Sequence, residues 1–159
     1  MPIDLIAEVC AVLGPLTSSV LVCAPSSPEE AVERFDASGA KALQLHSLTP
    51  EEVGEVGEHG IPVIRALTPS REQAVRFAPF ARALLFESGL PGTGSSYDYS
   101  SIPMDASNRV IVAGGLTPAN LHLAKALKPY ALDVSSGVEV HPGRKDAALV
   151  SEFIRRAKE

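Results

Sequence analysis

Tryptophan is absent from this sequence, and cysteine occurs only twice, as Cys10 and Cys23. Two cysteines do not make a disulfide framework or a cysteine-based metal site. The sequence contains four histidines, none with a close metal-ligand spacing: His46, His59, His122 and His141. Without tryptophan, any aromatic stacking must use tyrosine or phenylalanine. We therefore expect neither a disulfide nor a bound metal ion.

The sequence also lacks a basic cluster and a long apolar run. The formal net charge is −5, so we do not expect a nucleic-acid partner. The apolar runs are too short to cross a bilayer, and Met1-Pro-Ile-Asp4 offers no basic region before a hydrophobic one. We expect a soluble, cytoplasmic protein without membrane contacts.

What is present is an ordinary globular composition, with 45% hydrophobic and 21% charged residues in 159 residues. Short apolar runs alternate with helical patterns. The predicted strands are 19–24, 42–46, 62–67, 83–87, 110–113 and 131–134. The predicted helices are 2–13, 28–38, 49–60, one from Ser70, 117–127 and 145–158. This alternation predicts six βα units, a parallel sheet and a single domain over 1–159, since no linker is visible.

Two folds fit strict βα alternation, an open doubly wound sheet and a (β/α)₈ barrel. Length favours the open sheet, because barrels usually need at least about 200 residues. Two motifs favour the barrel. Val110-Ile-Val-Ala-Gly-Gly-Leu116 and Leu132-Asp-Val-Ser-Ser-Gly-Val-Glu139 are apolar runs that stop at small residues. Such strand ends expose backbone N–H groups, and barrels often bind phosphate after the last two strands.

The longer segments that contain these motifs, Val110 to Leu121 and Lys128 to Glu139, resemble phosphoribosylanthranilate isomerase together with Gly143-Arg-Lys-Asp146. That family is a (β/α)₈-barrel enzyme of tryptophan biosynthesis. Leu43-Gln-Leu-His46 is similar to the family's V-Q-L-H strand. The stretch from Leu84-Leu-Phe-Glu-Ser88 to Gly92-Thr-Gly94 and Tyr97-Asp-Tyr99 is similar to its L-L-L-D-S…G-T-G…F-D-W sequence. The resemblance implies the Amadori rearrangement of N-(5-phosphoribosyl)anthranilate to a 1-deoxyribulose phosphate, by acid and base without a cofactor.

The sequence departs from the family at its start. The family's K-I-C-G strand, whose cysteine is the general base, has no counterpart, and Pro2-Ile-Asp-Leu5 resembles the family's second helix. We therefore expect an incomplete barrel, without the N-terminal βαβ portion of roughly 40 to 50 residues. The arginine that meets the anthranilate carboxylate in the family would also be missing. A truncated reading, a complementing segment or second copy, and a reduced relative all remain open.

The resemblance assigns the general acid, and positions at strand ends add the other candidate site residues. Glu87 stands where the family has its general acid, an aspartate. The predicted substrate-binding residues are Gly114, Gly115, Ser135, Ser136, Gly137, Asp133, Gly94, His46 and Arg65. The first two glycines and Ser135 to Gly137 would hold the phosphate. Asp133 would bond a sugar hydroxyl or orient the loop. Gly92-Thr-Gly94 is either a closing loop or a plain connection.

His46 and Arg65 lie at strand ends, where each would meet the substrate or serve the fold. Cys10 is expected to pack within its helix, and Cys23, at a strand end, is expected to be an incidental thiol. Glu139 and His141 are expected in a surface loop. The alternative to an isomerase is a non-catalytic phosphosugar-binding relative, or an interaction module that pairs through its open barrel edge.

Overall fold

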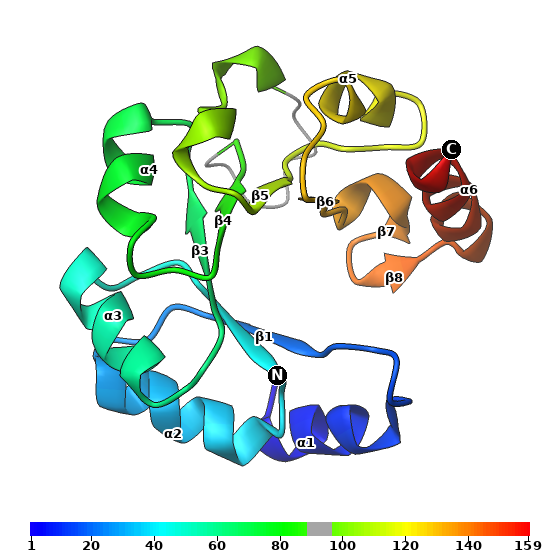
Figure 1. The fold of residues 1–159 in the computed structure, drawn as a ribbon. Helices are drawn as coiled ribbons and strands as arrows, with labels where there is room; N and C mark the ends of the chain where they lie inside the picture. Colours follow the sequence, from blue (N-terminus) through cyan, green and yellow to red (C-terminus); the bar gives the residue numbers. More distant parts are fainter. Residues whose placement is uncertain (89–96) are drawn as a thin grey trace. The chain divides into compact units, whose positions relative to one another are not determined.

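The computed structural model describes residues 1–88 and 97–159, and its parallel-paired strands β1 to β6 follow chain order (Figure 1). The contacts divide the chain into two compact units. The first comprises 1–66 and 76–83, and the second comprises 67–75 and 84–159. The division passes through β3 (Val63–Leu67) and α4 (Arg71–Phe77). The six predicted strands are therefore present, whereas the single domain stays a prediction.

The first unit contains β1 (Val20–Cys23), β2 (Ala42–Leu45) and most of β3, paired in parallel. Its helices are α1 (Ile3–Val12), α2 (Pro28–Ser38) and α3 (Pro50–Glu58). In Figure 1, α2 lies beside both α1 and α3. The core of this unit is aliphatic, and its fully buried side chains include Leu43, Leu45, Val53 and Val56.

Local sequence signals set the ends of these helices. Ser27 caps α2 by accepting a hydrogen bond from the Glu30 amide. Thr49 and Glu52 form a reciprocal capping box at the start of α3. Gly39, with φ +65°, ends α2 in the left-handed conformation that glycine adopts without a steric penalty.

The second unit contains β4 (Ala83–Phe86) from Leu84 onward, β5 (Val110–Val112) and β6 (Ala131–Leu132). These strands are parallel, with Leu84 opposite Val110 and Ile111 opposite Ala131. Every residue of β4 and β5 is buried, which explains why both read as uninterrupted apolar runs. The helices are α5 (Leu121–Lys125) and α6 (Ala147–Lys158), with 3₁₀ turns η1 (Tyr99–Ser101), η2 (Met104–Ala106) and η3 (Ser136–Val138).

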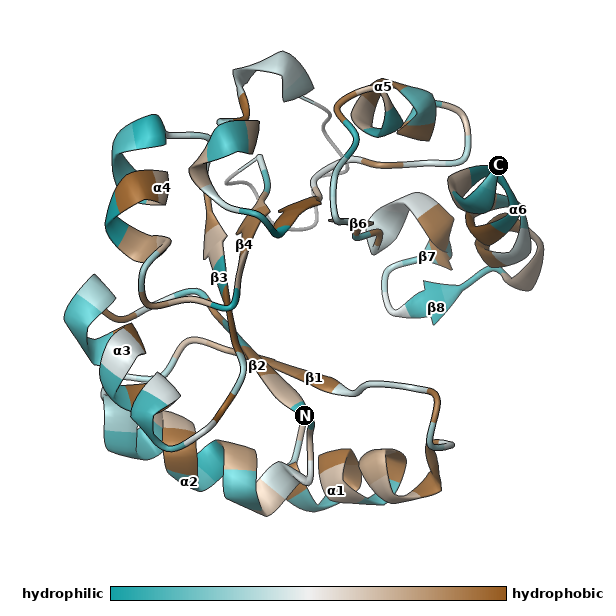
Figure 2. Cartoon of the chain, in the orientation of Figure 1, coloured by the Kyte–Doolittle hydropathy of each residue, from teal (hydrophilic) through white to brown (hydrophobic). Residues whose placement is uncertain are grey.

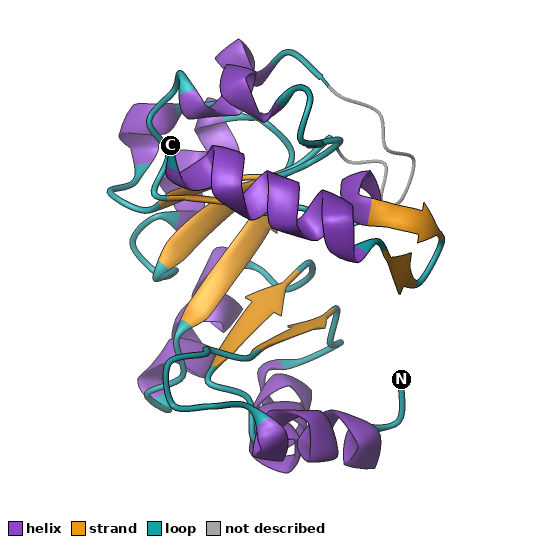
Figure 3. Ribbon diagram, turned by 90° about the vertical axis from the view of Figure 1, so that its right-hand side faces the viewer, coloured by secondary structure: helices purple, strands orange, loops and turns teal. Residues whose placement is uncertain are grey.

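The sequence predictions were wrong at several boundaries of this unit. A two-stranded antiparallel sheet, β7 (Glu139–His141) and β8 (Arg144–Lys145), occupies the expected surface loop (Figure 3). The closing helix starts at Ala147, because the Asp146 side chain accepts hydrogen bonds from the Ala148 and Leu149 amides. The helix expected from Thr117 starts only at Leu121, after a turn.

Apolar residues colour β4 and β5 mostly brown in Figure 2, as expected for buried strands, whereas the exposed β8 is teal. Helix α1 differs, since none of its residues is buried and Val12 is largely exposed. Within residues 1–88 and 97–159, no helix is long and apolar enough to span a membrane.

Candidate active site

The candidate site lies where β5 and β6 end. These strands are neighbours in a parallel sheet, so their carboxyl ends meet at one edge. After β5 the chain passes through Gly114 (φ +83°) and Gly115 (φ +65°), two successive left-handed positions. After β6 it passes through Ser135, with φ −122° and ψ −88°, into η3. The predicted glycine and serine pairs thus follow adjacent strands.

The two loops touch each other through their backbones. A Cβ added to Gly137 would lie 1.7 Å from the carbonyl oxygen of Leu116. No side chain fits at that distance, so position 137 needs glycine for close backbone approach rather than for a turn. The structure therefore brings the two predicted phosphate motifs into one place.

Side chains bind the carbonyl oxygens of both loops. The Tyr99 hydroxyl donates to the Gly114 oxygen at 2.7 Å, and the Asn120 Nδ2 donates to the Gly115 oxygen at 2.9 Å. The Lys145 ammonium donates to the Ser135 carbonyl at 3.0 Å and to its Oγ at 3.2 Å. These three roles were not predicted from the sequence, although all three residues stand in the segments that carry the family resemblance.

The backbone N–H groups of the same loops have no such partners. In the described part of the chain, those of Gly114, Gly115, Ser136 and Gly137 donate to no protein acceptor. Unpaired N–H groups that converge on one place form a concave site for an anion. The loops can therefore supply hydrogen-bond donors to a phosphate.

Glu87 directly follows β4 and lies against the same glycine turn. Its amide donates to the Leu67 oxygen at 3.0 Å, and a Cβ on Gly114 would lie 3.3 Å from the Glu87 Cα. Its charge also helps to raise the pKa of Tyr97, a shift caused mainly by burial of the phenol. The predicted general acid and the predicted phosphate loop are thus adjacent through their backbones.

Asp133 follows β6 immediately, and its amide donates to the Val112 oxygen at 2.9 Å. Surrounding protein atoms raise the pKa of its carboxyl above the ordinary value even though the side chain reaches solvent, and the Lys145 ammonium partly offsets that rise. A carboxyl that is costly to ionise at a strand end suits a functional role. The predicted contact with a sugar hydroxyl stays a prediction.

His46 and Arg65 belong to the first unit. The Arg65 guanidinium is buried, donates to the Leu45 oxygen at 2.7 Å and lies 4.6 Å from the centre of the Phe77 ring. Burial lowers its pKa. His46 lies 3.1 Å from the Gln44 amide through its Nε2. These contacts give Arg65 a use within the fold, and substrate contacts for both residues stay predictions.

The structure gives less support for a functional role at the remaining predicted positions. Gly94 and the Gly92-Thr-Gly94 loop lie outside the described residues. Cys10 and Cys23 are both half-buried free thiols, and burial raises the pKa of Cys23. A raised pKa disfavours the thiolate that a cysteine base or nucleophile requires. Over residues 1–88 and 97–159, no group of three or more metal-ligating side chains occurs.

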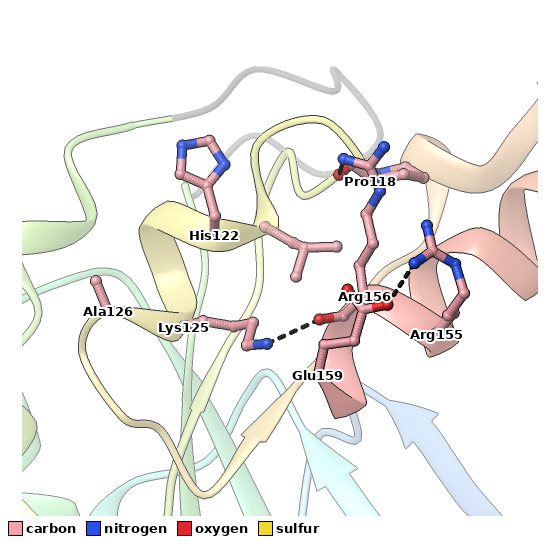
Figure 4. Close-up of a pocket in the computed structure, with 8 residues that line it drawn as sticks. Pro118, His122, Lys125, Ala126, Arg155, Arg156 and Glu159 are labelled. Carbon is pink, nitrogen blue, oxygen red and sulfur yellow. Dashed lines mark hydrogen bonds and ion pairs between the residues drawn. The ribbon is translucent and has the colours of Figure 1, made fainter.

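A pocket of about 500 Å³ lies between α5 and α6 rather than at the strand ends (Figure 4). Its cationic side chains are already engaged. The Lys125 ammonium donates to the Arg156 carbonyl at 2.8 Å, Arg155 pairs with Glu159, and Arg156 pairs with Glu152. The pocket is therefore a less suitable anion site than the loops.

Comparison with known proteins decides the family. The model of the N-(5'-phosphoribosyl)anthranilate (PRA) isomerase family matches residues 10–156. The chain belongs to this family. PRA isomerase is an enzyme of tryptophan biosynthesis, so the predicted resemblance is confirmed, and the non-catalytic alternative is not favoured.

Two relatives illustrate the match. The PRA isomerase of Halobacterium salinarum is 39% identical, over 90% of this chain and 72% of the relative. That of Methanothrix thermoacetophila is 37% identical, over 99% of this chain and 80% of the relative.

Solved PRA isomerases share the fold. The Thermus thermophilus structure covers 98% of this chain and 79% of its own, with a TM-score of 0.87 and 35% identity. The Thermotoga maritima structure covers 99% of this chain and 81% of its own, with a TM-score of 0.89 and 30% identity. The α/β fold of parallel strands is confirmed.

Proposed function

We propose that this chain contributes the phosphate-binding half and the general acid of a PRA isomerase site. The observation that carries the proposal is the backbone contact between Gly137 and Leu116, because it joins the two strand-end loops into one donor-lined surface. The phosphate of a phosphoribosyl substrate is the anion that such a surface suits. A PRA isomerase structure with a TM-score of 0.86 to this chain holds reduced 1-(o-carboxyphenylamino)-1-deoxyribulose 5-phosphate.

In this proposal Glu87 donates a proton to the ring oxygen of the furanose. The bond between that oxygen and C1 breaks, which gives an open-chain Schiff base. A base then removes the C2 proton, and the resulting enolamine becomes the ketone, so that no atoms are gained or lost. Glutamate is one methylene longer than aspartate, and a misplacement of about 1 Å can cost on the order of 100-fold in rate. Asp133 would bind a sugar hydroxyl beside the phosphate.

We assign the role of general base to none of these residues. The 159 residues contain no K-I-C-G motif, and the two cysteines present are half-buried. We infer a barrel of which this chain forms about six βα units. The base would come from an N-terminal βαβ portion, either as part of a longer chain or as a complementing segment, or from a second copy. One related structure is of monomers generated from dimeric Thermotoga maritima PRA isomerase. We expect the protein in the cytoplasm.

The test is turnover of the phosphoribosyl substrate, followed by the loss of anthranilate fluorescence at high protein concentration. The chain is assayed alone and with an added βαβ segment that carries K-I-C-G. Turnover in either case, removed by excess inorganic phosphate, supports the proposal. Binding of the substrate without turnover in both cases would instead indicate a non-catalytic phosphosugar-binding relative.

A further inference from the structure

The three side chains that bind loop carbonyls share one arrangement. Tyr99, Asn120 and Lys145 come from three different segments, and each donates to the backbone oxygen of a residue in the candidate phosphate loops. A carbonyl oxygen carries partial negative charge and repels a phosphate, whereas the amide of the next residue attracts it. Each hydrogen bond therefore fixes a peptide unit whose two ends act on an anion in opposite ways.

We propose that Tyr99, Asn120 and Lys145 are positioning residues that hold the carbonyls of Gly114, Gly115 and Ser135 so that the loop amides remain available to the substrate phosphate. The inference rests on the proposed function, since it concerns how that phosphate site is kept in order. It assigns no contact between these side chains and the phosphate itself.

Lys145 is the most informative member, because a lysine beside a phosphate loop would ordinarily be taken as a ligand. Its ammonium has three N–H donors. Two are used by Ser135, through its carbonyl and its Oγ, and the third meets the Glu139 carboxylate at 2.7 Å. No donor is left for a ligand, and Glu139 balances the charge. Lys145 therefore acts through the Ser135 peptide.

The hydrogen-bonding groups of Tyr99 and Asn120 are likewise already used within the protein. The single hydroxyl proton of Tyr99 goes to Gly114 at 2.7 Å, and Tyr99 is only 5% exposed. Asn120 uses Nδ2 for Gly115 and its Oδ1 accepts the Thr117 amide at 2.7 Å. Both successive left-handed glycines thus have their carbonyls held, which fixes a turn that glycine alone would leave free.

The first experiment measures inorganic phosphate binding by the shifts of the loop amides in ¹⁵N-labelled protein. Lys145→Met should weaken phosphate binding about tenfold, the effect expected from losing roughly 1.4 kcal/mol of ordering. Lys145→Arg, which can still donate to Ser135, should recover most of it. Lys125→Met is the matched control, because it also removes a lysine bond to a carbonyl, that of Arg156, and should leave phosphate affinity unchanged.

A second pair of variants tests the glycine turn. Tyr99→Phe should weaken phosphate binding about fivefold, in keeping with one hydrogen bond of about 1 kcal/mol. Tyr97→Phe removes a similar hydroxyl bond to the Phe86 oxygen, one strand away, and should change the affinity less than twofold. In turnover assays the same variants should raise KM and leave kcat within about twofold, since the phosphate is remote from the reacting bonds.

The outcomes separate the inference from the function it rests on. Absence of phosphate-induced shifts in the unaltered protein would reject the proposed phosphate site. Phosphate binding by the unaltered protein that Lys145→Met and Tyr99→Phe leave intact would reject only the positioning role. A Lys145→Arg protein as weak as Lys145→Met, with both folded, would also overturn it.

Discussion

The strand ends of the two units use polar groups in opposite ways. In the first unit polar side chains serve the fold, since Arg65 donates to the Leu45 carbonyl and the Ser47 hydroxyl donates to the Pro25 carbonyl. In the second unit side chains also bind carbonyls, but within residues 1–88 and 97–159 several amides of the loops they hold donate to no acceptor. Hydrogen bonds from side chains to carbonyl oxygens thus complete the fold at the strand ends of the first unit. In the second unit the same kind of bond holds loops whose amides can still bind a phosphate.

The largest expected effect is on the turnover rate, at the Glu87 carboxyl group beside the candidate phosphate loops. Glu87→Gln keeps the shape but cannot supply the proton, so turnover should fall about 10²- to 10⁴-fold, the usual range for losing a general acid. Initial rates are measured in whichever assay shows turnover, the chain alone or with the added segment. Glu87→Asp is the control and should retain activity, because the family uses aspartate there. Equal rates for Glu87→Gln and the unaltered protein would remove Glu87 from the chemistry.

The next effect is on stability at the contact between the loops. Gly137→Ala places a Cβ 1.7 Å from the Leu116 oxygen, so the backbones must separate. The free energy of unfolding should fall by roughly 3 kcal/mol or more, at the upper end of overpacking costs, with loss of phosphate binding. Gly143→Ala, at a glycine of φ +82° with open space around it, should cost only about 1 kcal/mol, from the conformation alone. Urea denaturation of both variants checks this. Equal losses of unfolding free energy would contradict the close backbone contact between the two loops.

Arg65 tests whether polar side chains at the strand ends of the first unit serve the fold. Arg65→Ala removes the hydrogen bond to Leu45 and the contact with the Phe77 ring, and it leaves a cavity. We expect a loss of about 2–4 kcal/mol in the free energy of unfolding, as for other large truncations in a core. Arg65→Met fills the space and should restore part of that loss. If Arg65→Met is as stable as the unaltered protein but no longer binds substrate, Arg65 is a ligand and the comparison fails.

The smallest effect is the pH dependence at Asp133. Its pKa is raised in the folded state, so the stability it contributes is present below its unfolded pKa of about 3.9 and is lost as the pH rises through the folded pKa. Asp133→Asn should therefore be slightly more stable than the unaltered protein at pH 7, by well under 1 kcal/mol because the side chain reaches solvent.

The stability difference should vanish below about pH 4, where both side chains are neutral. Urea titrations at pH 3.5 and pH 7 check this. The same variant should lose activity, as expected when a functional carboxyl is kept at a cost in stability. A stability gain of equal size at both pH values would show that ionisation of Asp133 is not the cause.

Much of the fold could be predicted from the sequence. The strands were visible because β4 and β5 are buried at every position and read as continuous apolar runs. The predicted helix 28–38 matches α2, whose start is set by the Ser27 cap. The β7–β8 hairpin was missed, because β7 and β8 are short and mostly exposed, so they show no apolar alternation. The turn before α5 was missed because the side chains of Thr117 and Asn120 each accept a hydrogen bond from the other's backbone amide. Helix propensity does not reveal such local side-chain-to-backbone bonds.

The site divides in the same way. Gly114, Gly115 and the Ser135 to Gly137 run could be recognised, since their small residues stand in sequence next to strands. The holding role of Tyr99, Asn120 and Lys145 could not, because it depends on contacts between segments as much as 15 residues apart. The bond from Arg65 to the Leu45 carbonyl could not be predicted either, since a strand-end arginine reads the same whether its guanidinium faces a ligand or a backbone oxygen.

The central claim is that the two strand-end loops of the second unit form one phosphate site. The most direct measurement is a titration of the unaltered ¹⁵N-labelled protein with inorganic phosphate. The account predicts saturable shifts of the Gly114, Gly115, Ser136 and Gly137 amides with a single common affinity. Shifts that fit two different affinities for the two loops, or that occur only at the pocket between α5 and α6, would contradict it.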